Sequence, residues 1–135
     1  MTVNRRTGVR ELVARAESEI EVVPAEEVLG LAGDPGALLV DLRDVRELQR
    51  DGRIPGAFHM PRGMVEFWVD PQSPYFKEVF AEDRRFVFFC NKGWRSALAT
   101  KAAQDVGLER AAHMDGGFEA WVAAGGAIEK PPPQK

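Results

Sequence analysis

Residues 86–96 read FVFFCNKGWRS, an apolar run that ends at a cysteine and passes into a short polar segment. A second apolar run, ALLVD at residues 37–41, ends at a carboxylate. Uninterrupted apolar runs of about four or five residues are typical of strands buried on both faces of a parallel sheet. These two stretches therefore predict the central strands of an α/β fold.

Helical patterns lie on either side of these runs. From Val9 to Ile20 apolar residues recur at helical spacing, and the charged residues between them, Glu17 included, are predicted to face away. Shorter strands are predicted at 22–23 and 111–113. Further helices are predicted to begin near Pro24, Val45, Met64, Arg95 and Phe118. This alternation favours a parallel sheet that helices cover on both faces, with ligands bound beyond the carboxyl ends of the strands.

The composition is that of one ordinary globular domain. The 135 residues are 44% hydrophobic and 29% charged, with a net charge of -3, close to average soluble proteins. The negative charge argues against nucleic acid as the main partner, and no apolar run has the roughly 20 residues of a membrane helix. A single cysteine forms no internal disulfide and no cysteine cluster for a metal, so we expect a cytoplasmic protein without a metal or other cofactor.

The segment after the 86–89 run combines features that activate a thiol. Cys90 ends the strand, Gly93 allows a tight turn, and a helix is predicted to begin at Arg95. The helix N-terminus and the cations Lys92 and Arg95 favour the thiolate, which is the nucleophile. The same cradle would hold an anionic substrate or the terminal sulfur of a persulfide. From the residues alone, an inert cysteine buried as a small apolar side chain is an equally good interpretation.

Three segments in register resemble the single-domain rhodanese family of thiosulfate sulfurtransferases. The loop at residues 90–96 is similar to that family's active-site loop, a cysteine followed by four residues, an arginine and a serine. Residues 41–57, with DLR and IPGA, resemble its first signature, and GGFEAW with AGG at 116–126 resembles its last. The resemblance implies a three-layer rhodanese-like α/β fold, in which helices cover both faces of a mainly parallel sheet of about five strands.

The resemblance also divides the chain. It covers about residues 22–129 as a rhodanese-like domain, and a Pro-rich tail follows at 130–135. The amphipathic helix predicted within 1–21 precedes this region, and we expect it to pack on the domain or, alternatively, on a second copy of the chain. Arg53 stands where the family usually has histidine. The segment 64–83 and the N-terminal helix are longer than in the minimal family domain.

The activity that the resemblance implies is sulfur transfer in two steps. Cys90 takes sulfur from a small sulfur-containing anion such as thiosulfate and passes it from a persulfide to cyanide or a thiol, and a protein could serve as donor or acceptor. No membrane or nucleic-acid partner is implied. Substrate binding is assigned by resemblance to Asn91, Lys92, Gly93, Trp94, Arg95 and Ser96. Asp41 and Arg43 brace the loop by resemblance, although a purely structural ion pair explains them equally well.

Two other functions are open to this chain. Tyrosine phosphatases and arsenate reductases of the same fold place five residues between cysteine and arginine, whereas Asn91–Trp94 supplies four, a loop better suited to a single sulfur atom. A non-catalytic rhodanese-like module that binds partners is the other alternative, and such modules commonly lose the cysteine. Among the remaining residues, Ser96 is predicted to cap the following helix. Both His59 and His113 are predicted to be non-catalytic.

Overall fold

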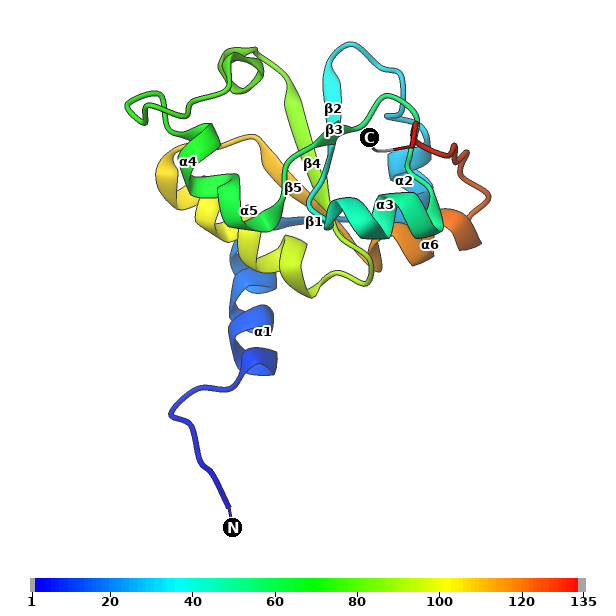
Figure 1. Cartoon of the computed structure of the whole chain (residues 1–135). Helices are drawn as coiled ribbons and strands as arrows, with labels where there is room; N and C mark the ends of the chain where they lie inside the picture. The colour runs from blue at the N-terminus through cyan, green and yellow to red at the C-terminus, as the bar shows by residue number, and fades with distance from the viewer. Residues whose placement is uncertain (1, 134–135) are drawn as a thin grey trace.

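The computed structural model describes residues 2–133 and has the alternating order of elements expected from the sequence (Figure 1). The elements are α1 (Val9–Glu19), β1 (Glu21–Val23), α2 (Ala25–Leu29), β2 (Ala37–Asp41), α3 (Val45–Asp51), β3 (Phe58–His59), the 3₁₀ turn η1 (Arg62–Met64), α4 (Val65–Val69), the 3₁₀ turn η2 (Glu78–Ala81), β4 (Arg85–Phe89), α5 (Trp94–Val106), β5 (Ala111–Met114) and α6 (Gly117–Ala123).

The five strands form one parallel sheet in the order β1-β5-β4-β2-β3. The two apolar runs pair with each other over five residues, from Ala37 opposite Arg85 to Asp41 opposite Phe89. Because the strands are parallel, the residues that follow β2 and β4 emerge at the same edge of the sheet. The three-layer α/β fold is confirmed.

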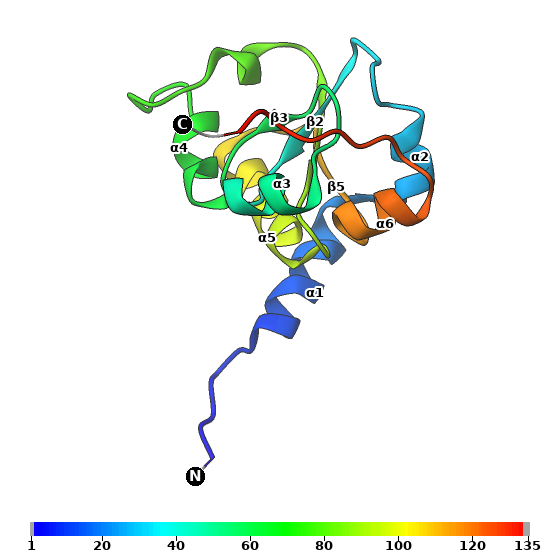
Figure 2. The ribbon, with the colours of Figure 1, turned by 45° about the vertical axis from the view of Figure 1, so that its right-hand side comes forward.

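Alternate residues of β4 pack into two separate cores on opposite faces of the sheet. Val87 and Phe89 contribute to a cluster that includes side chains of α2 and α6, and Phe86 and Phe88 to one that includes side chains of α4 and α5. A strand with both faces covered has no solvent face to hold polar side chains, which explains its uninterrupted apolar sequence. Figures 1 and 2 show the helices on the two sides of the sheet.

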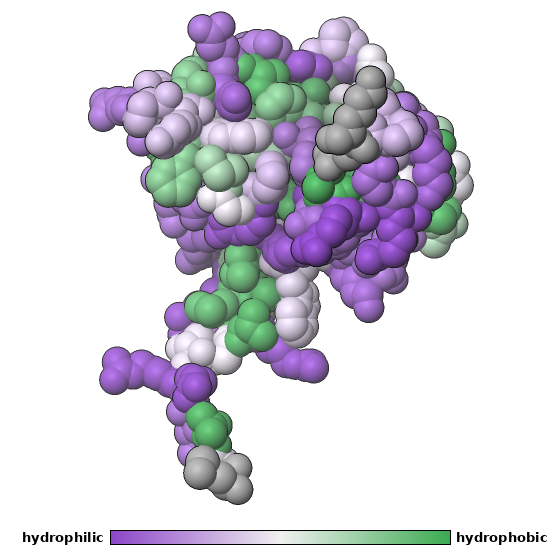
Figure 3. Space-filling model, in the orientation of Figure 1, coloured by the Kyte–Doolittle hydropathy of each residue, from purple (hydrophilic) through white to green (hydrophobic). Residues whose placement is uncertain are grey.

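The N-terminal helix α1 packs against α5. Val13 and Ala16 are buried in a cluster with Ala97 of α5. Only part of the predicted apolar stripe is covered, since Val9 and Leu12 are 45% and 42% exposed. Figure 3 shows apolar surface on this helix. No helix in the described part of the chain has the length and apolarity to cross a membrane.

The C-terminal segment lies along α3 (Figure 2). Lys130 Nζ donates a hydrogen bond to Arg50 O at 2.8 Å, and Gln49 Nε2 donates to Pro132 O at 3.1 Å. Two contacts from one helix thus fix the direction of the tail as far as Pro133.

Truncating β4 tests the two-sided core. Phe88 is fully buried, so Phe88→Ala should lower the free energy of unfolding by about 3–5 kcal/mol, the loss of apolar burial plus the cavity left behind. Phe67→Ala is the matched control, because that side chain is 51% exposed and its removal should cost less than about 1 kcal/mol. Urea denaturation measures both, and equal losses would contradict the assignment of Phe88 to the core.

Candidate active site

Cys90 follows β4 directly, and the chain turns within three residues into α5. The turn depends on Gly93, whose φ of 122° lies in the region that side-chain-bearing residues rarely adopt. Gly93 also packs on β5, because a Cβ there would lie 3.4 Å from His113 Cε1. The loop is therefore bent at a glycine that the backbone conformation requires, and a neighbouring ring packs directly against it.

The first turn of helix α6 holds the backbone of the Cys90 loop through hydrogen bonds. Phe118 N donates to Cys90 O at 2.8 Å, and Glu119 N donates to Asn91 O at 3.1 Å. These donors are first-turn amides of α6, which have no partner within their own helix. A Cβ on Gly117 would lie 2.5 Å from Cys90 O. Gly117 is thus explained by the close approach of two backbones, whereas a Cβ on Gly116 would lie 2.7 Å from Ala120 Cβ.

Cys90 is one of five residues that line an open pocket. Its side chain is buried, only 1% exposed, yet with Asn91, Lys92, Trp94 and Arg95 it lines a hollow of about 570 Å³. Gly93 N donates a hydrogen bond to Sγ at 3.1 Å. Cys90 thus lies at the border between the apolar core and the pocket, next to the start of α5.

The two cations of the loop are both paired with carboxylates. Arg95 makes a bidentate ion pair with Glu47 of α3, at 2.8 and 2.9 Å. These hydrogen bonds are the main reason that the pKa of Arg95 is raised, and the charges of Glu47, Cys90 and Asp41 act in the same direction. Lys92 Nζ lies 3.9 Å from Glu119 and its side chain is 77% exposed. Arg95 is therefore held at the pocket wall, whereas Lys92 is held only weakly.

Two further loop residues have partners of their own. The Asn91 side chain donates to Glu119 Oε2 at 3.1 Å, which adds a side-chain link between the loop and α6. Trp94 is 47% exposed, with the guanidinium of Arg10 5.7 Å from its ring centroid. The Trp94 ring thus borders the pocket on the side from which α1 approaches.

Asp41 and Arg43 form a buried structural ion pair. The Arg43 guanidinium donates to both Asp41 carboxylate oxygens and, at 2.9 Å, to Gly52 O, and it lies 4.0 Å from the Phe118 ring centroid. Within the described residues neither side chain has a hydrogen bond to the 90–96 loop. Their support of the loop is indirect, through the C-terminal end of α3 and through α6.

Two polar side chains behind the sulfur differ from expectation. Ser96 does not cap α5; its hydroxyl lies 2.8 Å from His113 Nδ1 and 3.5 Å from Cys90 Sγ. Glu17 of α1 does not face away, because Oε2 lies 3.3 Å from His113 Nε2. A histidine inside an otherwise apolar strand was the one available signal in the sequence, and nothing in the helical pattern of α1 singled out Glu17.

Comparison with known proteins identifies the family. The model of the rhodanese-like domain matches residues 24–124. A mouse thiosulfate sulfurtransferase/rhodanese-like domain-containing protein 3 is 30% identical over 105 residues, 74% of this chain and 67% of that protein. The thiosulfate sulfurtransferase GlpE of Pseudomonas putida is 29% identical over 78% of this chain and 88% of its own.

A solved structure from Rhodopseudomonas palustris is more similar still. It is 50% identical, with a TM-score of 0.91, over 96% of this chain and 99% of that chain. That protein is named as one of unknown function and a possible tyrosine phosphatase. The similarity extends beyond the region that the family model matches.

The glycine of the loop provides a test of its geometry. Gly93→Ala should lower the free energy of unfolding by about 1–3 kcal/mol, because φ is positive there and the new Cβ meets the His113 ring. Gly63→Ala is the control, since no atom lies within 4 Å of its built Cβ, and it should change stability by less than about 0.5 kcal/mol. Chemical denaturation compares them, and an equally stable Gly93→Ala protein would contradict the described turn.

The Glu47–Arg95 ion pair should make stability depend on pH. Hydrogen bonding by Arg95 lowers the pKa of Glu47 below its usual 4.5, so the unfolded chain binds more protons than the native one as the pH falls below that value. The stabilisation is then present above pH 4.5 and lost on acidification through the lowered pKa. Glu47→Gln should cost about 1 kcal/mol at neutral pH, and the difference from wild type should shrink in acid. A difference independent of pH would contradict this.

Proposed function

The chain belongs to the rhodanese family, and on this premise we propose that it is a sulfurtransferase that carries sulfur as a persulfide on Cys90. The observation that carries the proposal is the position of Cys90, which is one of the residues lining the pocket and whose Sγ accepts a hydrogen bond from the Gly93 amide at 3.1 Å. A cysteine held by a backbone amide at the border of a pocket is suited to carry a second sulfur atom. The free thiol also suits a reducing compartment such as the cytoplasm.

The first step is attack on a sulfur donor. With thiosulfate, the Cys90 thiolate forms a bond to the outer sulfur, the sulfur–sulfur bond of the donor breaks, and sulfite leaves with the bonding electron pair. The enzyme keeps a persulfide that carries one negative charge. The N-terminus of α5 and Arg95 supply positive potential for both the dianionic donor and the persulfide.

The second step removes the sulfur. An acceptor thiolate or cyanide attacks the terminal sulfur of the persulfide, and Cys90 leaves as a thiolate. Cys90 is the only cysteine in the sequence, so no internal thiol can displace the sulfur, and the acceptor must enter through the pocket. Dividing the transfer in this way replaces one difficult step by two easier ones.

Phosphatase activity is the second candidate because the 50%-identical Rhodopseudomonas palustris protein carries that name. One feature of this chain favours sulfur transfer over phosphate-ester hydrolysis. Only four residues separate Cys90 from Arg95, where phosphatases of this fold use five.

Mass spectrometry after thiosulfate treatment tests the proposal. The intact protein should gain the mass of one sulfur atom, and cyanide should remove it. Cys90→Ser is the control and should gain nothing, because its hydroxyl is a far weaker nucleophile.

The phosphatase alternative is measured on the same preparations with p-nitrophenyl phosphate. Hydrolysis that is lost in Cys90→Ser, together with an unchanged mass after thiosulfate, would replace the sulfurtransferase by a phosphatase. An unchanged mass with thiosulfate and with a low-molecular-weight persulfide donor, and no hydrolysis, would favour the non-catalytic module.

A further inference from the structure

A continuous chain of polar side chains runs from the sulfur of Cys90 to the N-terminal helix. Ser96 Oγ lies 3.5 Å from Cys90 Sγ and 2.8 Å from His113 Nδ1, and His113 Nε2 lies 3.3 Å from Glu17 Oε2. The members come from the catalytic loop, α5, β5 and α1. Elements distant in sequence thus converge on one line of hydrogen bonds.

The middle of this chain is buried. Ser96 and His113 are both fully buried, on the side of the sheet covered by α5. Burying a hydroxyl or an imidazole without hydrogen-bond partners is costly, and an apolar pair of similar volume would avoid that cost. The buried polar pair lies next to the only cysteine in the sequence, with Ser96 in contact with it.

The hydrogen bonds that link Glu17, His113, Ser96 and Cys90 can be assigned donors and acceptors in one consistent direction. An ionised carboxylate only accepts, so His113 Nε2 must carry the proton that is shared with Glu17. In a neutral imidazole Nδ1 then accepts, and the Ser96 hydroxyl donates to it. The hydroxyl oxygen keeps lone pairs for the Cys90 S–H group. Ser96 Oγ also lies 3.3 Å from Gly93 O, but its single proton goes to the closer acceptor.

From this geometry we propose that Ser96, His113 and Glu17 form a proton relay that ionises Cys90. The proton of Sγ moves to Ser96 Oγ while the hydroxyl proton moves to His113 Nδ1, which leaves a thiolate and an imidazolium. Glu17 stabilises the imidazolium through Nε2–H. The thiolate is left with hydrogen bonds from the Gly93 amide and the Ser96 hydroxyl, and protonation of Cys90 reverses the movement.

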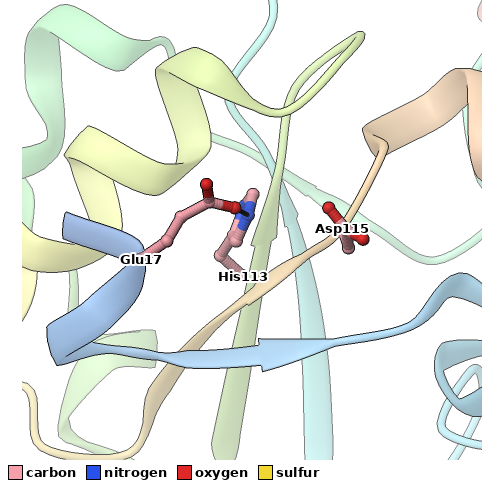
Figure 4. A group of neighbouring side chains, drawn as sticks. All are labelled: Glu17, His113 and Asp115. Carbon is pink, nitrogen blue, oxygen red and sulfur yellow. Dashed lines mark hydrogen bonds and ion pairs between the residues drawn. The ribbon is translucent and has the colours of Figure 1, made fainter. Parts of the chain in front are cut away.

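The charges around His113 suit a base that is neutral at rest. Burial lowers the pKa of His113, and Glu17 and then Asp115 oppose that shift. A neutral ring can accept a proton, and the two carboxylates stabilise the imidazolium once it forms. Figure 4 shows Glu17 reaching the ring from α1, with Asp115 just beyond the end of the strand that carries His113. One polar atom from each of the three residues lies within 4.8 Å of the other two.

The relay makes α1 part of the active site. Glu17 lies in a helix that precedes the region matched by the family model. The inference rests on the proposed function only in taking Cys90 as the reacting group. It assigns Glu17 and His113 as positioning residues that act through Ser96, and it does not depend on which sulfur compound is the substrate.

The pH dependence of alkylation tests the relay. Because Cys90 is the only cysteine, reaction with iodoacetamide reports on it alone. Ser96→Ala should move the midpoint of the pH–rate profile to the alkaline side by about one pH unit and slow the reaction at neutral pH roughly tenfold. Glu17→Gln should shift it in the same direction. Circular dichroism and thermal unfolding verify that each variant is folded.

A matched control lies two residues away on the same helix. Glu19 is paired with Lys101 at 3.1 Å on the surface, so Glu19→Gln removes the same charge and should leave the profile superposed on wild type. Profiles of Ser96→Ala and Glu17→Gln that also superpose on wild type would overturn the relay while leaving sulfur transfer intact. A shifted profile together with no uptake of sulfur from thiosulfate or from a low-molecular-weight persulfide would retain the relay and reject the proposed function.

Nitrogen-15 NMR of the imidazole tests the direction of the relay without any variant in the chain of hydrogen bonds. The proposal requires the tautomer with the proton on Nε2, and His59→Gln assigns the signals, since the sequence holds two histidines. A proton resident on Nδ1 would overturn the relay, because that nitrogen could not accept from Ser96.

The side chains of Glu17, His113 and Asp115 could instead bind a metal ion. A metal on Nε2 would displace the proton shared with Glu17, so the two roles exclude each other. Alkylation measured after treatment with EDTA, and again with added Zn²⁺, separates them. An unchanged profile after EDTA supports the relay, and a profile lost with EDTA and restored by Zn²⁺ overturns it.

Discussion

The site depends on the contact between the backbone of the Cys90 loop and the first turn of α6. The carbonyl groups of Cys90 and Asn91 accept hydrogen bonds from the Phe118 and Glu119 amides, and Gly117 leaves no side chain between the two backbones. These hydrogen bonds hold the chain that leaves β4 close to the sheet. They thereby help to position the turn at Gly93, the start of α5 and the pocket that Cys90 lines.

Two ion pairs lie near the loop, one of them buried and the other accessible to solvent. Arg43 is fully buried and balanced by Asp41, so it joins β2 to α3 and α6 without reaching the pocket. Arg95 is partly exposed at the pocket wall and held in one orientation by Glu47. A fixed guanidinium loses little side-chain freedom when an anion arrives, which favours binding through preorganisation. The Asp41–Arg43 pair stabilises the fold, and the Glu47–Arg95 pair holds a positive charge at the pocket.

The N-terminal helix has two roles that share one packing face. Val13 and Ala16 bury the helix against α5, and this packing directs Glu17 toward His113. Holding the carboxylate costs little beyond the burial that already fixes the helix. A charged group at the outer end of a buried histidine can therefore be positioned by apolar contacts alone, which connects the stability of the domain to the chemistry proposed for Cys90.

The sequence by itself determined the parallel sheet, the two central strands and the cysteine loop. Each is a local pattern: apolar runs without polar interruption, a glycine at a sharp turn and a helix start beside a thiol. The tertiary structure alone decided that Ser96 faces His113 instead of capping α5, that Arg43 stays away from the loop, and that Glu17 turns inward. Those outcomes depend on which elements meet across the sheet. Helical spacing fixes the face on which a charge lies, but only the packing of α1 on α5 decides what that face contacts.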